Sequence, residues 1–475
     1  TYLYSIWYNH KKTFHKVGTT MKIDLRENKK LQTLKGWGTS ACWWSQYCAD
    51  EETAEEIAEL LYGKSGLGLN IYRYNIGGGT DPENCRVKNP WRVTESFYKY
   101  NREDATGAYD FTADKTAISM MKRCLDKGSV DTLIVFANSP HYSQTSTGQA
   151  SGSLINHTCN LPMSNYRKFA DYFLTCTQAL IDMGIPVKYV SPINEPQWKW
   201  GGSYVWQEGC HYETEEMVAV YRIFAEEILK RGMDVKLYGP ESGEMMGLTP
   251  EYIKAITADE TIMKVMDIFA YHSYHDDNNP KIRLDFKKEI VEKYPQFRFD
   301  MSEWCELPNK SHTKNFKGAL ITARIIGQDL IYAGAESWTS WVAVNQFSIK
   351  EDGNDYSDAT ITATNDFSDW YIARRYWGFA HFSKYIPVGS VCLDNGYFPD
   401  ENNDFNVFSF LTPKGETVTV VVNEGEDREL SINGNYTEMK VIQSVDEDYL
   451  NEIYNGEFKD KITVKQNSIL TIICK

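Results

Sequence analysis

Short apolar runs alternate with amphipathic stretches through the middle of the chain. In the stretches between the runs, apolar residues recur at three- and four-residue steps, as on one face of a helix. This alternation is typical of βα units around a parallel sheet. We predict eight strands, over Leu34–Ser40, Leu67–Ile76, Thr132–Asn138, Val187–Ile193, Val235–Gly239, Asp267–Tyr274, Phe297–Met301 and Ala335–Val342.

Three of the stretches are clear helix predictions because each ends in a glycine suited to a C-cap. They cover Glu51–Gly63, Asn165–Gly184 and Glu215–Gly232. Eight βα units predict a (β/α)8 TIM barrel. A doubly wound open sheet is the alternative, but no glycine-rich phosphate loop follows the first predicted strand.

After about Pro387 the helical period disappears. ETVTVVVN, RELSIN, MKVIQSV and SILTIICK are predicted as short strands, with turns at Asn433-Gly434 and Asn455-Gly456. These features predict an all-β sandwich. TTMKIDL, from Thr19 to Leu25, also looks like a strand, and we expect it to pack on that sandwich. The predicted domains are 1–33 (strands joining the β-domain), 34–384 (barrel) and 385–475 (sandwich).

The composition narrows the kind of ligand. Aromatic residues make up 14% of the 475 residues, and aromatic rings suit the flat faces of sugars as well as a large core. The net charge of −15 argues against nucleic acid and against anionic membrane surfaces. The start, TYLYSIWYNHKK, lacks the apolar core of a signal peptide. A secreted protein with its signal removed and a cytoplasmic protein both remain open.

The 10 cysteines are scattered and form no C-x-x-C pair. A zinc site is therefore not expected, and the cysteines are interpreted as reduced thiols. No cofactor is predicted.

Carboxylates follow two of the predicted strands. The fourth run ends in Asn194-Glu195, and the seventh runs into Ser302-Glu303-Trp304. In a TIM barrel the catalytic groups lie at the carboxyl ends of the strands. Strands four and seven face each other across the barrel, which suits a carboxylate separation of ~5.5 Å and a retaining glycosidase. Either glutamate alone would be as consistent with an ordinary surface carboxylate.

Several motifs flank these carboxylates in a familiar order. They are GWGTSACWW from Gly36, RYNIGGG from Arg73, NSP from Asn138, YHSYH from Tyr271 and SWTSW from Ser337. Together with the N-E-P and S-E-W runs they resemble glycoside hydrolase family 30, within the clan of retaining (β/α)8 glycosidases. The first-strand run and RYNIGGG are most similar to the endo-β-1,6-galactanase branch. The resemblance implies a barrel joined to a β-domain that an amino-terminal strand completes.

By this resemblance Glu195 matches the general acid/base and Glu303 the nucleophile. Glu303 is expected to keep a low pKa with the help of Arg73 and Tyr274. Asn194 is expected to donate to the sugar 2-hydroxyl. A structural ion pair for Arg73 and a core position for Tyr274 are the alternatives.

The remaining substrate-binding candidates are mostly aromatic. Trp341 matches the floor of the −1 subsite, and one of Trp43 and Trp44 is expected in the core. Where many family members have an aromatic residue after Ser-Pro, this chain has His141, which puts that wall of the cleft in doubt. For His272, a hydrogen bond near the nucleophile is one interpretation and a buried structural histidine is the favoured alternative. A metal at His272 and His275 lacks a third ligand. The candidates are Trp341, Trp43, Trp44, Asn138, His272, Trp198 and Trp304, with Trp200 beside Trp198 as a leaving-group platform.

The expected partner is an oligo- or polysaccharide. Neither a nucleic acid nor a membrane is expected as a partner, and the oligomeric state stays open. β-1,6-Linked galactan of arabinogalactan type is the predicted substrate. An exo-acting β-glycosidase, a β-1,6-glucanase and a xylanase are alternatives, because one hydroxyl separates galactose from glucose. A carbohydrate-binding scaffold without turnover and a metal hydrolase on the same barrel are the alternatives outside the family's chemistry.

Overall fold

The computed structural model describes residues 20–26, 29–81, 83, 85–154, 157–202, 205–307 and 311–475. The run TYLYSIWYNHKK lies outside these ranges. None of the helices within them combines the length and the apolar character that crossing a bilayer requires.

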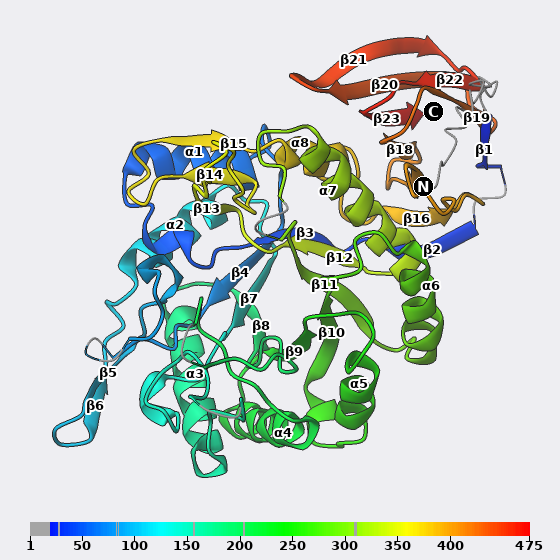
Figure 1. Cartoon of the computed structure of the whole chain (residues 1–475). Coiled ribbons are helices and arrows are strands. Elements are labelled where there is room, and N and C mark those ends of the chain that lie inside the picture. Colours follow the sequence, from blue (N-terminus) through cyan, green and yellow to red (C-terminus); the bar gives the residue numbers. More distant parts are fainter. Residues whose placement is uncertain are drawn as a thin grey trace, which may run out of the picture.

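Eight parallel strands close into a barrel, in the order β10-β11-β12-β3-β4-β7-β8-β9 (Figure 1). Each of the eight predicted strands overlaps one of them, so the TIM barrel is confirmed and the open doubly wound sheet is wrong. The strands are β3 (Gly36–Ser40), β4 (Ile71–Asn75), β7 (Thr132–Phe136), β8 (Val187–Ser191), β9 (Lys236–Ser242), β10 (Met266–His272), β11 (Arg298–Trp304) and β12 (Ser337–Ser340).

A helix follows each barrel strand. Gly232 caps α4 with a left-handed φ of 62°, as its sequence predicts, whereas Gly63 ends α1 in an extended conformation with φ −72°. The helices are α1 (Glu51–Tyr62), α2 (Lys115–Asp126), α3 (Tyr166–Asp182), α4 (Thr214–Arg231), α5 (Thr249–Thr257), α6 (Pro280–Glu289), α7 (Lys317–Gln328) and α8 (Arg375–Ser383).

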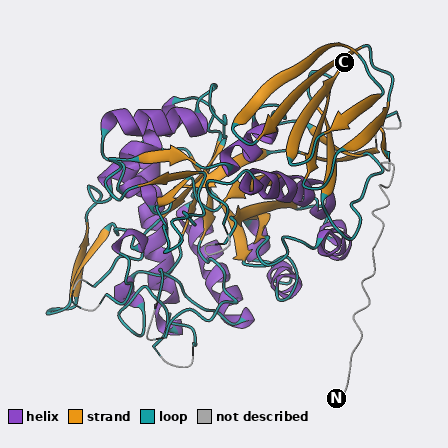
Figure 2. Cartoon of the chain, turned by 45° about the horizontal axis from the view of Figure 1, so that its top comes forward, coloured by secondary structure: helices purple, strands orange, loops and turns teal. Residues whose placement is uncertain are grey.

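Two sheets form the β-domain, which lies beside the barrel (Figure 2). One has the order β2-β16-β17-β18-β23-β20-β21 and the other β1-β19-β22. Their strands are β1 (Met21–Asp24), β2 (Lys29–Thr33), β16 (Val391–Asp394), β17 (Phe405–Leu411), β18 (Thr417–Asn423), β19 (Arg428–Asn433), β20 (Glu438–Val445), β21 (Asp448–Glu457), β22 (Lys461–Val464) and β23 (Ser468–Cys474).

Both amino-terminal strands belong to this β-domain. Met21 of β1 pairs in parallel with Leu430 of β19, and Thr33 of β2 pairs with Val391 of β16. We therefore propose the division into 1–33, 34–384 and 385–475, of which residues 1–19 lie outside the described part.

One predicted turn is wrong. Asn455-Gly456 lies inside β21, where it pairs with Lys440 and Met439 of β20. The chain reverses earlier, next to Glu447, whose φ is 65°. β21 could not be predicted as a strand because its exposed, polar sequence has no apolar alternation.

Two smaller sheets lie outside the barrel and the β-domain. A hairpin projects from the loop after β4 (Figure 1), and a three-stranded sheet follows β12. They consist of β5 (Tyr98–Asn101) and β6 (Thr106–Tyr109), and of β13 (Val344–Gln346), β14 (Ile361–Ala363) and β15 (Trp370–Ile372).

The barrel and the β-domain share one apolar core through α7 and α8. Gly327 of α7 lies so close to the ring of Phe408 in β17 that a Cβ would overlap it. Phe382 of α8 contacts the same ring. Inside the barrel, a separate cluster that includes Ile71, Ile134 and other buried residues fills the centre. The barrel is thus a packed core, and its polar groups gather at the carboxyl ends of the strands.

Candidate active site

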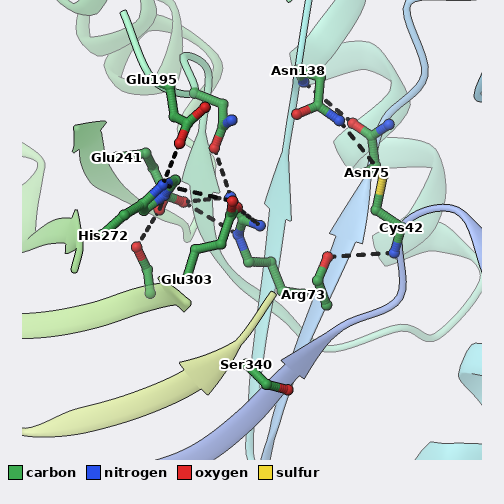
Figure 3. Close-up of polar contacts among 12 residues, drawn as sticks. Cys42, Arg73, Asn75, Asn138, Glu195, Glu241, His272, Glu303 and Ser340 are labelled. Carbon is green, nitrogen blue, oxygen red and sulfur yellow. Dashed lines mark hydrogen bonds and ion pairs between the residues drawn. The ribbon is translucent and has the colours of Figure 1, made fainter. Parts of the chain in front are cut away.

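The two predicted carboxylates lie side by side at the mouth of the barrel (Figure 3). One oxygen of Glu195, just after β8, lies within 4.8 Å of one oxygen of Glu303, in β11. Both side chains are largely buried, with exposed fractions of 7% and 4%. They reach a cavity of about 220 Å³, lined by Arg92, Glu195, Trp198, Trp200, Gln207, Tyr274, His275, Glu303, Cys305, Leu307, Trp341 and Asp358.

Arg73 joins several of the polar groups beneath this cavity. Its guanidinium lies 2.9 Å from Oε2 of Glu303 and 2.9 Å from Oδ1 of Asn194. The same group lies 3.6 Å from the centre of the Phe136 ring. Arg73 is fully buried, and such a charge requires this kind of pairing. It therefore holds the carboxylate and the amide in fixed positions.

Tyr274 supplies the second donor to Glu303, with its hydroxyl 3.1 Å from Oε1. Even so, the expected low pKa of Glu303 is wrong. Burial raises the pKa of the Glu303 carboxyl to about 7, against the opposing charges of His272 and Arg73. Burial outweighs the hydrogen-bond donors because the charged carboxylate loses its hydration in this closed position, whereas the neutral acid loses much less.

Glu241 is a third buried carboxylate that the sequence analysis missed. It lies in β9, is 0% exposed, and accepts hydrogen bonds from Arg73 and Ser302. The predicted fifth strand stops at Gly239, whereas β9 continues through Pro240 to Ser242. Like Glu195 and Glu303, Glu241 follows an apolar run in the sequence. Pro240 separates it from that run, which hides the relation.

His272 lies between the carboxylates and does not line the cavity. Nδ1 is 3.0 Å from Glu195 and 3.6 Å from Glu303, and Nε2 is 3.3 Å from Glu241. Burial would lower the pKa of His272, but Glu303, Glu195 and Glu241 outweigh it and raise the pKa to about 9. His272, a predicted substrate-binding residue, therefore lies beneath the carboxylates and not on the cavity lining.

Donor atoms of Glu195, His272 and Glu303 also lie close enough together to hold a metal ion. A metal requires a neutral imidazole, and the raised pKa of His272 favours the cation instead. Arg73 already neutralises Glu303 at 2.9 Å. The residues of this cluster therefore fit a set of ion pairs better than a metal centre.

Tryptophans form the walls of the cavity. Trp341 lines it, and its ring meets the ring of Trp43 nearly at right angles, with centroids 5.3 Å apart. Trp198 and Trp200 line the side next to Glu195. The indole nitrogen of Trp200 lies 3.2 Å from the carbonyl oxygen of Glu195, which fixes this platform to the carboxylate.

The structure places three of the predicted tryptophan contacts away from the cavity lining. Trp44 is 0% exposed and donates to the Ser40 carbonyl, so it is the core member of the Trp43-Trp44 pair. Trp304 is buried against Trp338 and donates to Asp277. Trp43 lies behind Trp341 and not on the cavity lining.

Asn138 is also buried, with its amide 3.5 Å from Sγ of Cys42 and its backbone N–H 3.3 Å from Asn75. His141 is fully buried and hydrogen-bonds to Ser96 and Ser143, so it forms no wall of the cleft. Neither side chain lines the cavity.

The backbone is strained at two of the three carboxylates. Glu195 has φ 47° and Glu241 has φ 56°, in the left-handed region that non-glycine residues avoid. The N–H of Glu195 donates to the carbonyl of Glu241 at 2.8 Å, which joins the two strained residues. A Cβ at Gly243 would lie 2.9 Å from Oε1 of Glu195, so glycine permits this close approach. Strain of this kind is typical of functional sites.

Barrels that carry paired carboxylates and aromatic rings around one cavity at the carboxyl ends of their strands form the class of barrel glycosidases. The family model of O-glycosyl hydrolase family 30 matches residues 19–359, more than two thirds of the chain. This chain belongs to that family, as its motifs predict, and it is a glycosidase.

Two curated relatives and one solved structure show how far the similarity extends. An endo-β-1,6-galactanase from Hypocrea rufa is 26% identical over 236 residues, which are 45% of this chain and 47% of that protein. The chain thus spans about half the length of this relative. The lysosomal acid glucosylceramidase of Mus musculus is 23% identical over 443 residues, 88% of this chain and 80% of that protein. A conserved exported protein from Bacteroides fragilis has the same fold, with a TM-score of 0.81 and 23% identity over 96% of this chain and 100% of that one.

Proposed function

We propose that this glycosidase hydrolyses β-1,6-linked galactan with retention of configuration. The observation that carries the proposal is the proximity of Glu195 and Glu303, whose nearest oxygens lie within 4.8 Å at one cavity. Retaining enzymes separate their carboxyl groups by about 5–5.5 Å, and inverting enzymes by about 6.5–9.5 Å, because the latter need room for a water.

In the first step, Glu303 attacks the anomeric carbon and Glu195 gives its proton to the departing glycosidic oxygen. In the second step, Glu195 takes a proton from water, which attacks the same carbon and releases Glu303. Arg73 and Tyr274 hold the two oxygens of Glu303 in place. Asn194 accepts from Arg73 through Oδ1, which leaves its amide nitrogen to donate to the sugar 2-hydroxyl.

The choice of galactan rests on the similarity to the endo-β-1,6-galactanase. A cavity of about 220 Å³ fits one sugar ring over Trp341, where cleavage takes place. Trp198 and Trp200 extend this lining on the side of Glu195, from which the leaving group departs. This aromatic surface supports a substrate with a further sugar beyond the cleaved bond.

Product analysis on a small panel tests the proposal. The panel contains β-1,6-galactan, β-1,6-glucan, glucuronoxylan, and aryl β-galactoside, β-glucoside, β-xyloside and β-fucoside. We expect a ladder of oligosaccharides from β-1,6-galactan, with the β-anomer formed first in proton NMR. A ladder from another polymer would overturn the choice of galactan. Monosaccharide alone would indicate exo cleavage and contradict the expected ladder. An α-anomer formed first would overturn retention.

A further inference from the structure

Glu241 has no access to the substrate, yet it contacts both cations that lie beneath the cavity, Arg73 and His272. It is 0% exposed and does not line the cavity. Its Oε1 lies 3.4 Å from Nε and Nη2 of Arg73. Its Oε2 accepts from His272 at 3.3 Å and from the hydroxyl of Ser302.

The two cations held by Glu241 are those that touch the paired carboxylates. Arg73 donates to Glu303, and Nδ1 of His272 lies 3.0 Å from Oε1 of Glu195. The backbone adds a third link, since the carbonyl of Glu241 accepts from the N–H of Glu195. One buried carboxylate thus connects both halves of the catalytic pair.

We propose that Glu241 is a positioning residue that keeps His272 in its cationic form, with both ring nitrogens donating, so that Oε1 of Glu195 accepts a hydrogen bond and Oε2 carries the catalytic proton. This inference rests on the proposed roles of Glu195 and Glu303. The inference adds a role for Glu241, which decides which oxygen of Glu195 faces the leaving group.

The alternative state shows why the charge matters. A neutral His272 beside ionised Glu241 would keep its proton on Nε2, which faces that carboxylate. Nδ1 would then be an acceptor and would draw the proton of Glu195 away from the glycosidic oxygen. Loss of the second proton from His272 should therefore remove the general acid from its working orientation.

The charges around His272 come from several elements. Glu241 faces it from β9, Glu303 from β11 and Glu195 from the loop after β8. Tyr274 lies beside the ring, and Arg73 of β4 shares Glu241 and Glu303 with it. Replacing Glu241 with a neutral residue removes the carboxylate that lies 3.3 Å from Nε2 of His272, so the pKa of His272 should fall.

The test compares Glu241→Gln with the wild type. We expect the alkaline limb of kcat to move down by about one pH unit or more. For an aryl β-glycoside with a poor leaving group, the loss should be small at pH 7 and approach about tenfold above pH 9. For a dinitrophenyl glycoside, which needs no protonation, the loss should be small at both pH values. Equal losses for both leaving groups, or an unmoved alkaline limb, would overturn the proposal. A wild type inactive on all substrates would instead count against the proposed function.

Glu208→Gln is the matched control. Glu208 is buried at the same end of the barrel, and burial raises its pKa to about 8, so the amide replaces a group that is already mostly neutral at pH 7. It contacts Asn75 and Thr94 and none of the site carboxylates in the described structure. We expect an unchanged alkaline limb.

Nitrogen-15 NMR of the histidine rings gives a readout independent of activity and of the stability of the variant. In the wild type, both nitrogens of His272 should carry protons at pH 7. A neutral His272 at that pH would overturn the proposal, even if Glu241→Gln does not fold. Ser302→Ala, which removes one donor from Glu241 and keeps its charge, should leave His272 protonated at pH 7.

Discussion

Among the fully buried histidines of the described structure, His272 and His381 have surroundings that give them different charges. His272, at the barrel mouth, is surrounded by carboxylates that raise its pKa to about 9. The ring of His381, in α8 at the contact with the β-domain, hydrogen-bonds to two hydroxyls of the described residues, those of Thr471 and Ser444, and burial lowers its pKa to about 3. Burial alone therefore does not decide the charge of a histidine; the partners inside the buried site do.

The same contrast separates the two regions. At the interface, every described contact of the imidazole is neutral and suits packing between the barrel and the β-domain. At the mouth, three carboxyl groups, Arg73 and a protonated His272 are held together in a buried cluster. Such an arrangement costs stability and is kept for chemistry. Mutations at the barrel mouth should therefore reduce activity, whereas mutations at the interface should reduce stability.

The largest effect is expected for Glu303→Gln. Loss of the nucleophile should reduce kcat by a factor on the order of 10⁴ or more. The free energy of unfolding should stay the same or rise, because a strained, charged site loses a buried charge. Kinetics with an aryl glycoside and urea unfolding measure the two quantities. Substantial activity in this variant would remove Glu303 from the proposed mechanism.

Glu195→Ala should have the next largest effect on activity. We expect kcat to fall by about 10²–10⁴-fold for poor leaving groups, since proton donation is lost. With a dinitrophenyl glycoside, added azide should restore turnover and yield the β-glycosyl azide, because the space left by the carboxyl admits a small nucleophile. If azide has no effect on such a substrate, the acid/base belongs to another residue.

The interface should respond to pH through stability. The pKa of His381 is about 3 in the folded protein and 6.5 when exposed. The unfolded chain therefore binds the proton first, and stability falls as the pH drops below 6.5. The free-energy advantage of the wild type over His381→Asn should shrink by about 2 kcal/mol between pH 7 and pH 5. Urea unfolding at both pH values measures it, and a constant difference would contradict the neutral form of His381.

Tyr274→Phe should have the smallest effect. Loss of one hydrogen bond to Glu303 costs about 1–2 kcal/mol, or roughly tenfold in kcat/KM. Since Glu303 acts as the anion and its pKa is about 7, the acid limb of kcat/KM should lie near pH 7 in the wild type. The variant should shift that limb to higher pH, because a donor to the anion is gone. An acid limb that does not move would show that another group sets it.

The sequence predicted the barrel strands and the positions of Glu195 and Glu303 because apolar runs ended in carboxylates. It could not separate Trp43 from Trp44, because they lie in the segment after β3, where no strand or helix period applies. It could not predict the burial of Trp304 in β11, since parallel barrel strands are covered on both faces and show no alternation. Glu241 was missed because the predicted strand ended at Gly239, whereas β9 continues to Ser242. Gln207 and Asp358 line the cavity from loops, where periodicity gives no information.

The pairing of β1 with β19 has a consequence for synthesis. Met21 meets Leu430, so the first described strand has no partner until more than 400 residues later in the chain. At about 5–20 residues per second, a ribosome needs about 20–80 s to supply that partner. The barrel strands between them pair mostly with near neighbours in the chain and can close meanwhile. The β-domain is therefore the last part of the molecule to assemble, and an edge strand waits exposed on the nascent chain until the β-domain strands emerge.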